Sequence, residues 1–311
     1  MLFECAMHRL VGNTKTMPNM RHQGHQSGFT LMEMVISLVV LSLLSLVMIP
    51  LMGLPLAAYT DAQRRVDLHS QMELIRAKLT DDLQNAMPGS LRVRQLGTSY
   101  FLEYLEVHAV GRYRTGAGGP GYCPAAPACA GGDALGTACA QESCLTTMGP
   151  LIVTPGSAVA VGVDYVAIAS LNADPYLASP NASLTRLTLR ATAGLPTYEG
   201  LRFNANRFVN GSPSNRVYIV SPVSYECNWG NGQLTRYWGY AFNPNQPTAF
   251  GAAPSALLAD TLANRCIFSV SSLPGNGLRQ VLAMQFTLAR QSADQVREAT
   301  EGFLQIGTRE P

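Results

Sequence analysis

Residues 28–33 have the sequence GFTLME, and the run that follows them, from Met34 to Thr60, contains no charged side chain. This run of 27 residues is longer than the roughly 20 that a helix needs to cross the hydrocarbon core of a bilayer. Glu33 stands at the start of the run, and no basic residue lies beside it in the sequence. Because a carboxylate at that depth costs a few kcal/mol, Glu33 indicates a functional site that needs a positively charged partner.

The charges on the two sides of the apolar run indicate how it is oriented. Residues 1–28 carry Arg9, Lys15, Arg21 and three histidines, whereas the charges directly after the run are mixed in sign. The positive charge before the run places the N-terminus in the cytoplasm and the residues beyond about 60 outside. The run is too long for a secretory signal and residues 56–58 make a poor cleavage site, so we expect no signal-peptidase cleavage there.

The segment Ser27–Glu33 resembles the signature of type IV prepilins and type II secretion pseudopilins. The resemblance implies that a prepilin peptidase cuts between Gly28 and Phe29 and that Phe29 is then N-methylated. Gly28 has no side chain, which lets the peptidase approach the backbone closely. Glu33 is then the fifth mature residue, and it pairs with the Phe29 ammonium of its own or the next subunit. The alternative is a plain signal anchor with a stray glutamate, which leaves the cost of the buried charge unexplained.

The resemblance also implies how the chain is divided and where it resides. The parts are a leader at 1–28, a long helix at 29–88 with a transmembrane segment at about 31–58, and a β-rich globular domain at 89–311. Because prepilin leaders are usually short, Met17 and Met20 are alternatives to Met1 as the start. The expected location is the inner membrane, crossed once with the globular domain in the periplasm, and then an extracellular pilus or a periplasmic pseudopilus.

Pro50, Gly53 and Pro55 interrupt the apolar run. Because proline removes a helix hydrogen bond and clashes with the preceding turn, we expect a kink or local melting near residues 50–55. The pattern of residues 61–87 then predicts the second half of the long helix, which is amphipathic and ends at Pro88. Its apolar stripe, which we expect to face the core, is Leu68, Met72, Ile75, Leu79, Leu83 and Ala86, and its polar face is Arg64, Arg65, Asp67, Arg76, Lys78, Asp81 and Asp82.

Residues 89–311 contain strand-like runs separated by loops rich in Gly, Pro, Asn and Ser. A long helix followed by such runs predicts an α+β protein, pilin-like, with a mostly antiparallel sheet. The predicted strands are Tyr100–Val107, Asp164–Ala169, Ser183–Thr192, Arg216–Pro222, Leu234–Phe242, Arg265–Val270 and Val281–Ala289. The predicted loops are 111–150, 172–182, 193–200, 204–215 and 243–256.

Six cysteines follow the leader, and an even number outside the membrane indicates disulfides. Cys227 and Cys266 flank strand-like segments and are expected to pair. The other four, which are expected to form two local bridges in the Gly- and Pro-rich insert at 111–150, are Cys123, Cys129, Cys139 and Cys144. A zinc site in the insert is the alternative, and it is disfavoured because the insert has no C-x2-C spacing and no nearby histidine.

No pattern in the chain indicates catalysis or a bound cofactor. The formal G-x-G-x-x-G at Gly116, Gly118 and Gly121 contains Pro120 and precedes no helix pattern. The histidines after the leader are His69, expected to be solvated or to pack, and His108, which is placed to pair with Glu106. We expect the carboxylates of Glu103, Glu106 and Asp164 to be solvated charges at strand ends. We therefore expect a protein that is not an enzyme and that holds no metal.

Net charge gives no indication of a nucleic-acid or polyanion partner. Of the 22 basic and 20 acidic residues of the chain, residues 1–28 contain three and one, so the processed chain has 19 of each. A neutral chain lacks the basic surface that nucleic-acid binding requires. An apolar anchor with a neutral domain is typical of a subunit that packs into a protein assembly.

Several later segments resemble, in order, those of minor pilins of the mannose-sensitive haemagglutinin (MSHA) pilus system. They are Ala86–Val93, Tyr104–Glu106 leading to Gly111–Arg114, Ser212–Tyr218, Val223–Cys227, and Leu257–Asp260 leading to Cys266–Phe268. The resemblance implies a low-abundance subunit that primes or caps a pilus. Its partners are then the prepilin peptidase, other major and minor pilins, the inner-membrane assembly platform and, before assembly, membrane lipid. Two alternatives remain, a pseudopilin of a type II secretion tip complex and an adhesive module displayed at a pilus tip.

Overall fold

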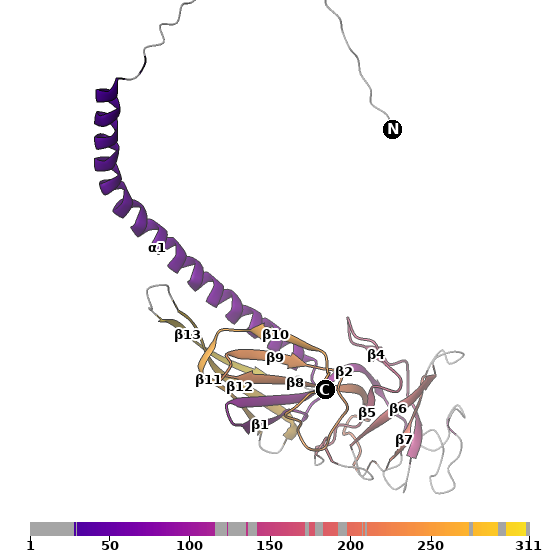
Figure 1. The fold of residues 1–311 in the computed structure, drawn as a ribbon. Helices are drawn as coiled ribbons and strands as arrows, with labels where there is room; N and C mark the ends of the chain where they lie inside the picture. The colour runs from indigo at the N-terminus through magenta and orange to yellow at the C-terminus, as the bar shows by residue number, and fades with distance from the viewer. Residues whose placement is uncertain are drawn as a thin grey trace, which may run out of the picture. The chain divides into compact units, whose positions relative to one another are not determined.

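A computed structural model gives the fold of the chain. It describes residues 28, 30–115, 123, 135, 142–171, 174–177, 183–191, 198–206, 208, 210–273, 276–291 and 297–308. The chain divides into two compact units, Met1–Tyr59 and Thr60–Pro311. Figure 1 shows the single helix, α1, and the strands that follow it.

Helix α1, Leu31–Gln84, is one continuous helix through Pro50, Gly53 and Pro55. The expected local melting at 50–55 is therefore wrong, because each proline removes only one backbone donor and the flanking apolar residues keep helical geometry. A kink at these residues stays a prediction. The helix ends at Gln84, three residues earlier than expected, because Ala86 leaves it to form a β-bridge with Glu106.

Within the second unit, the predicted apolar stripe of α1 is confirmed as core. Leu68, Ile75, Leu79 and Leu83 are each at most 1% exposed and pack in one cluster with residues of both sheets. Met72 packs against the same cluster from a half-buried position. Spacings of three and four residues bring these side chains onto one face, and burying them anchors this half of the helix.

The larger sheet has ten strands in the described residues, and every pairing in it is antiparallel. Its strands are β1 Arg92–Leu96, β2 Ser99–Arg112, β3 Glu142–Thr146, β4 Ile152–Val153, β5 Tyr165–Ala167, β6 Leu184–Ala191, β7 Gly200–Asn206, β8 Arg216–Asn228, β9 Gln233–Tyr237 and β10 Ser255–Ala259. The smaller sheet, in the order β11-β12-β13, consists of β11 Leu262–Leu273, β12 Asn276–Gln291 and β13 Arg297–Gly307.

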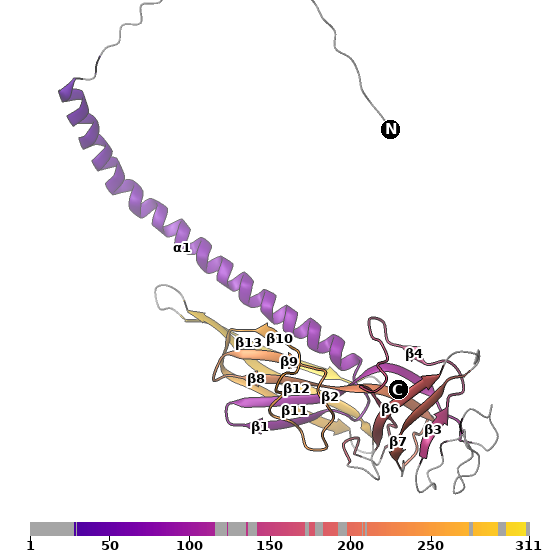
Figure 2. The same cartoon turned by 45° about the vertical axis from the view of Figure 1, so that its right-hand side comes forward.

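Strands β2 and β8 form the spine of the larger sheet, paired from Ser99↔Asn228 to Arg112↔Arg216. Each divides its outer edge between two neighbours. Strand β2 pairs with β1 and β4, and β8 pairs with β5 and β9. Different strands therefore flank the two ends of the spine. Figures 1 and 2 show β6 and β7 at one end, and β1, β9 and β10 toward the other.

Several strands differ from the sequence expectation. Strand β8 continues past Pro222, where it was expected to end, because Pro222 lies between the residues paired with β5 and those paired with β9. A missing donor there removes no bond on that edge, which is the arrangement that proline in a strand requires. The short strands β1, β4 and β7 and the C-terminal β13 were not expected. Strand β3 and the first two residues of β10 lie in predicted loops. The mostly antiparallel α+β fold itself is confirmed.

Candidate processing and assembly site

Helix α1 begins directly after the glycine motif, and Thr30 caps it. The Glu33 N–H donates to Thr30 Oγ1 at 3.2 Å, and the Met34 N–H donates to the Thr30 carbonyl at 3.1 Å. Threonine is a favoured N-cap because its hydroxyl satisfies a free N–H of the first turn. The cap places the Glu33 carboxylate in that first turn, where the helix dipole favours negative charge.

Gly28 lies two residues before the cap, in an open position. It is exposed, and an added Cβ would meet no atom within 4 Å. The backbone at Gly28 is therefore accessible to a peptidase, as cleavage requires. Phe29, the expected methylated residue, lies outside the described residues, as does the leader before Gly28.

The residues after Glu33 form a candidate membrane span, Leu31–Ile49, by length and composition. None of this span is buried within the chain. Its three serines donate back to carbonyls of the same helix: Ser37 to Glu33 at 2.7 Å, Ser42 to Val39 at 2.8 Å and Ser45 to Ser42 at 2.8 Å. Because every polar group in lipid needs an internal partner, these bonds suit the helix to an apolar environment.

Asp82, which was expected on the solvent face of the helix, is 1% exposed. Its Oδ2 accepts hydrogen bonds from Tyr104 at 2.8 Å, Tyr225 at 2.5 Å and Arg236 Nε at 2.7 Å. Lys78, one turn earlier in α1, approaches Oδ1 at 2.7 Å. The spacing contained the signal, because Asp82 follows Ile75 by seven residues and therefore shares its face.

The Asp82 cluster, comprising Asp82, Lys78, Tyr104, Tyr225 and Arg236, joins α1 to β2, β8 and β9. Burial by itself raises the pKa of Asp82, but the hydrogen bonds from Lys78 and Tyr225 and the charge of Arg236 outweigh it and hold the pKa below its usual value. The carboxylate is therefore ionised and saturated with donors, which is how a buried charge is tolerated.

The expectation that Glu103, Glu106 and Asp164 are solvated is wrong for two of them. Glu103 is fully buried and its carboxylate lies 2.6 Å from the Arg92 guanidinium. Burial raises the pKa of Glu103 to about 7, although Arg92 acts in the opposite direction. Asp164 is 1% exposed. Glu106 is half-buried and pairs with Arg236 at 3.1 Å.

His108 lies inside β2 and bridges two carboxylates. Its Nδ1 is 3.1 Å from Asp164 Oδ2, and its Nε2 is 3.9 Å from Glu106. The expected pairing with Glu106 thus exists, but Asp164 is the nearer partner. Hydrogen bonding to Asp164 and then to Glu106 raises the pKa of His108 to about 9. Ser221 donates to Asp164 at 2.6 Å, so the cluster is arranged around the aspartate and not around a serine nucleophile.

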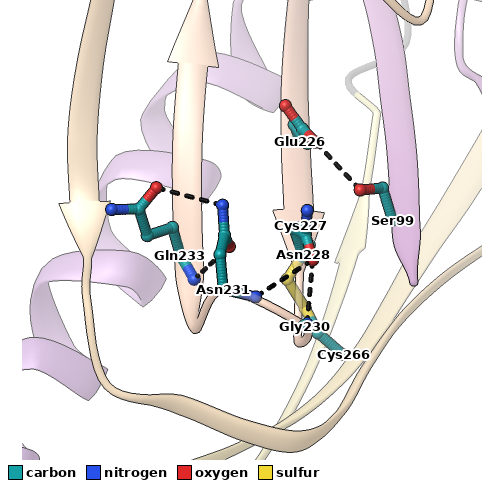
Figure 3. Close-up of a disulfide and its surroundings, with 8 residues drawn as sticks. All are labelled: Ser99, Glu226, Cys227, Asn228, Gly230, Asn231, Gln233 and Cys266. Atoms are coloured by element: carbon teal, nitrogen blue, oxygen red, sulfur yellow. Dashed lines mark hydrogen bonds between the residues drawn. A yellow bond between two sulfur atoms is a disulfide. The ribbon is translucent and has the colours of Figure 1, made fainter.

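The predicted disulfide Cys227–Cys266 is present, with the two Cα atoms 6.0 Å apart. Figure 3 shows it beside the turn from β8 to β9, where Asn228 Oδ1 accepts from the Gly230 N–H at 2.8 Å and from the Asn231 N–H at 3.3 Å. Both sulfurs are fully buried, and the bridge connects the larger sheet with the smaller one.

In the insert, Cys123 is bonded to Cys144, with Cα atoms 5.7 Å apart. A zinc site that uses all four insert cysteines is incompatible with that bond. Cys129 and Cys139 lie outside the described residues, so their pairing stays a prediction. The insert is also not wholly a loop, because β2 extends to Arg112 and β3 occupies Glu142–Thr146.

One comparison with known families bears on this site. A model of the prokaryotic N-terminal methylation motif matches residues 24–49, which include Gly28, Phe29, Glu33 and the apolar start of α1. No curated protein and no solved structure shows a significant match to the chain. The motif supports the type IV prepilin and pseudopilin class, and it implies processing by prepilin peptidase and assembly with other pilins. Together with the apolar helix, it fits a pilin anchored in the inner membrane.

Proposed function

We propose that the chain is a minor pilin of a type IV pilus of the MSHA kind, most similar to the minor pilin MshO, which primes or caps the filament. The observation that carries this proposal is the position of Glu33. It is a carboxylate in the first turn of a helix whose next 16 residues, Met34–Ile49, are apolar or small and exposed in the chain.

The two halves of α1 have different environments, which supports an assembly role. The stripe from Leu68 to Leu83 is covered by the β domain of the same chain, whereas the side chains of Leu31–Ile49 are uncovered. Lipid covers such a surface before assembly, and the equivalent helices of other pilins cover it afterwards. A Phe29 ammonium then neutralises Glu33 in the helix bundle, where the low dielectric strengthens the pair.

We propose a structural and not an enzymatic role. This is supported by how the buried ionisable groups are used. Asp82, Glu103 and Asp164 each hold together two or more elements of the domain through short hydrogen bonds. A catalytic group needs a free position toward a substrate, and these groups are committed to packing.

N-terminal sequencing and mass spectrometry of the membrane-extracted protein test the processing step. We expect a start at Phe-Thr-Leu-Met-Glu with a methylated first residue, and an intact leader in a strain without prepilin peptidase. A mature start at Tyr59, or an unprocessed leader in the wild-type strain, contradicts the proposal.

Fractionation distinguishes the pilus from a secretion machine. Sheared pili should contain the chain at low abundance, and in-cell crosslinking through the α1 apolar half should capture other pilins of the same filament. Crosslinks exclusively to pseudopilins of a secretion complex would replace the proposed role with that of a type II secretion tip subunit.

A further inference from the structure

Two arginines face each other at the end of the sheet spine. Arg112, the last residue of β2, is the direct cross-strand partner of Arg216, the first residue of β8. Like charges in directly opposite positions destabilise a sheet. In the described part of the chain, neither guanidinium lies within ion-pair distance of a carboxylate, and Arg112 Nε donates only to the Ser214 carbonyl at 3.3 Å. The pair therefore concentrates uncompensated positive charge.

A cavity of about 530 Å³ opens at this pair. Arg112 and Arg216 line one part of it, and Val110, Met148 and Ile152 line another. Met148 is 62% exposed and Ile152 is 72% exposed. A concave site with an apolar wall and a few convergent polar groups is the usual form of a small binding site.

Backbone contacts hold the walls of this Arg112–Arg216 cavity in place. The Met148 N–H donates to the Arg112 carbonyl at 2.7 Å, and Ile152 pairs with Val110 in the sheet. The side chain of Leu151 packs closely against Gly111, because an added Cβ at residue 111 would lie 2.5 Å from Leu151 Cδ2. The cavity is thus preformed by the fold, which lowers the entropy lost when a ligand binds.

The buried Tyr218 lies beside Arg216 and does not belong to the cavity lining. Tyr218 follows Arg216 by two residues, so both side chains lie on the same face of β8. Tyr218 is 4% exposed, and in the described part of the chain its hydroxyl has no partner in hydrogen-bonding geometry. Burial raises the pKa of the Tyr218 phenol, while nearby Arg216 acts in the opposite direction.

We propose that the Arg112–Arg216 cavity binds a carboxylate of a peptide, with a neighbouring aliphatic side chain of that peptide lying on Met148 and Ile152. Arginine presents its N–H groups in a fork that matches the two oxygens of a carboxylate. The cavity wall favours a peptide over an acidic sugar, because its described lining residues include no aromatic side chain on which a sugar ring would stack. Capture of a C-terminal carboxylate in this manner is an established mode of peptide recognition.

Calorimetric titration of the detergent-solubilised full chain tests the site. The probes are acetyl-Ala-Ala-Leu as the free acid and the same peptide as its C-terminal amide. We expect the free acid to bind, the amide not to bind, and the affinity to fall as salt is added, because exposed charge pairs are screened. Arg112→Gln and Arg216→Gln should each weaken binding of the acid about tenfold or more, as expected for loss of a charge-assisted hydrogen bond.

The matched control is Arg265→Gln, which removes an exposed arginine on β11 and should leave binding unchanged. Arg216→Lys keeps the positive charge but loses the paired N–H groups of the guanidinium, so it should weaken binding less than Arg216→Gln. It also provides a test of Arg216 if Arg216→Gln does not fold. A further probe is a C-terminally amidated peptide that contains an internal aspartate. If it binds, the proposal is supported, and the bound carboxylate is then that of a side chain. Binding of glucuronate but of no peptide, binding of no carboxylate, or an equal loss in Arg265→Gln would overturn it. The inference does not depend on the proposed pilin role.

Discussion

At the scale of single residues, Asp82 shows how this domain tolerates a buried charge. The carboxylate is surrounded by donors from α1, β2, β8 and β9, and Arg236 extends the cluster to Glu106. Each of these donors is itself buried or half-buried, so removing Asp82 leaves several groups without a partner. A buried cluster of this kind is destabilised far more by loss of one member than an exposed pair is.

Asp82→Asn should lower the free energy of unfolding by about 3 kcal/mol, because the half-buried Arg236 loses its counter-charge and the buried Tyr104 and Tyr225 lose a charged acceptor. Thermal or urea unfolding of the solubilised protein measures this change. Asp81→Asn is the matched control, because the Asp81 side chain is 70% exposed and the change should be within about 0.5 kcal/mol. Equal effects of the two substitutions would show that the cluster does not stabilise the fold.

His108 should make stability depend on pH in the alkaline range. Its folded pKa, about 9, lies above the ordinary value of 6.5 because of Asp164 and Glu106. The folded state thus retains a proton that the unfolded state loses. The stabilisation is complete below pH 6.5 and is lost as the pH rises through 9, and it amounts to at most about 3 kcal/mol.

The measurement is the unfolding midpoint between pH 6 and pH 10. His108→Gln should flatten the decline across this range, whereas His69→Gln, at an exposed position of α1, should preserve it. The groups that face His108 are Glu106 and Asp164, with Ser221 bonded to Asp164. A decline that persists in His108→Gln would assign the pH dependence to other groups.

At the scale of elements, the packing of the two sheets depends on both α1 and the Cys227–Cys266 bridge. The main core cluster contains the α1 stripe together with Tyr225 of β8, Phe268 of β11 and Phe286 of β12. The bridge joins β8 to β11 inside this cluster. It therefore crosslinks elements from different sheets, in addition to the apolar contacts between them.

Replacing both cysteines, Cys227→Ala with Cys266→Ala, should lower the free energy of unfolding by about 2–5 kcal/mol, because the crosslink constrains the unfolded chain and both sulfurs are packed. Denaturant unfolding under non-reducing conditions measures the loss. The comparison is Cys123→Ala with Cys144→Ala, which removes a bridge outside the main core cluster and should cost less. A larger loss for the insert pair would reverse this ranking.

At the scale of the whole molecule, Glu33 should matter for assembly more than for insertion. In a lone subunit the start of α1 lies near the membrane interface, where the carboxylate reaches water. In the proposed filament the helices would bundle, and a Phe29 ammonium is the expected group to neutralise it. Removing the Glu33 carboxylate should therefore destabilise the assembled state and leave the free subunit unaffected.

Glu33→Val should leave membrane insertion intact, because it removes a cost of roughly 2–3 kcal/mol from the helix. Cleavage after Gly28 should also persist, since the scissile bond is unchanged. The variant should be missing from sheared pili and from crosslinks to other pilins. Ser37→Val, one turn further along the exposed helix, is the control and should be incorporated normally. Wild-type incorporation of Glu33→Val would rule out the ammonium–carboxylate mechanism.

Local patterns were sufficient to predict the N-terminal part of the chain. A glycine and a carboxylate before an apolar run indicate the processing motif, because each acts through its immediate neighbours in sequence, and a family model of the N-terminal methylation motif matches there. The buried stripe of α1 was predictable for the same reason, since helical spacing alone brings Leu68, Ile75, Leu79 and Leu83 onto one face. Cys227 and Cys266 were predictable as a pair because both flank strand-like segments and the expected export favours disulfides.

Contacts between segments distant in sequence determined the rest. The spacing from Ile75 places Asp82 on the buried face, but its partners, tyrosines of β2 and β8 and an arginine of β9, lie far away in the sequence, and no pattern around residue 82 reveals them. Glu103 and Asp164 are buried because Arg92 and His108 neutralise them across the sheet. Arg112 and Arg216 face each other because the register of β2 on β8 places these two residues opposite each other. Register depends on the pairing of whole strands, so only the tertiary structure specifies it.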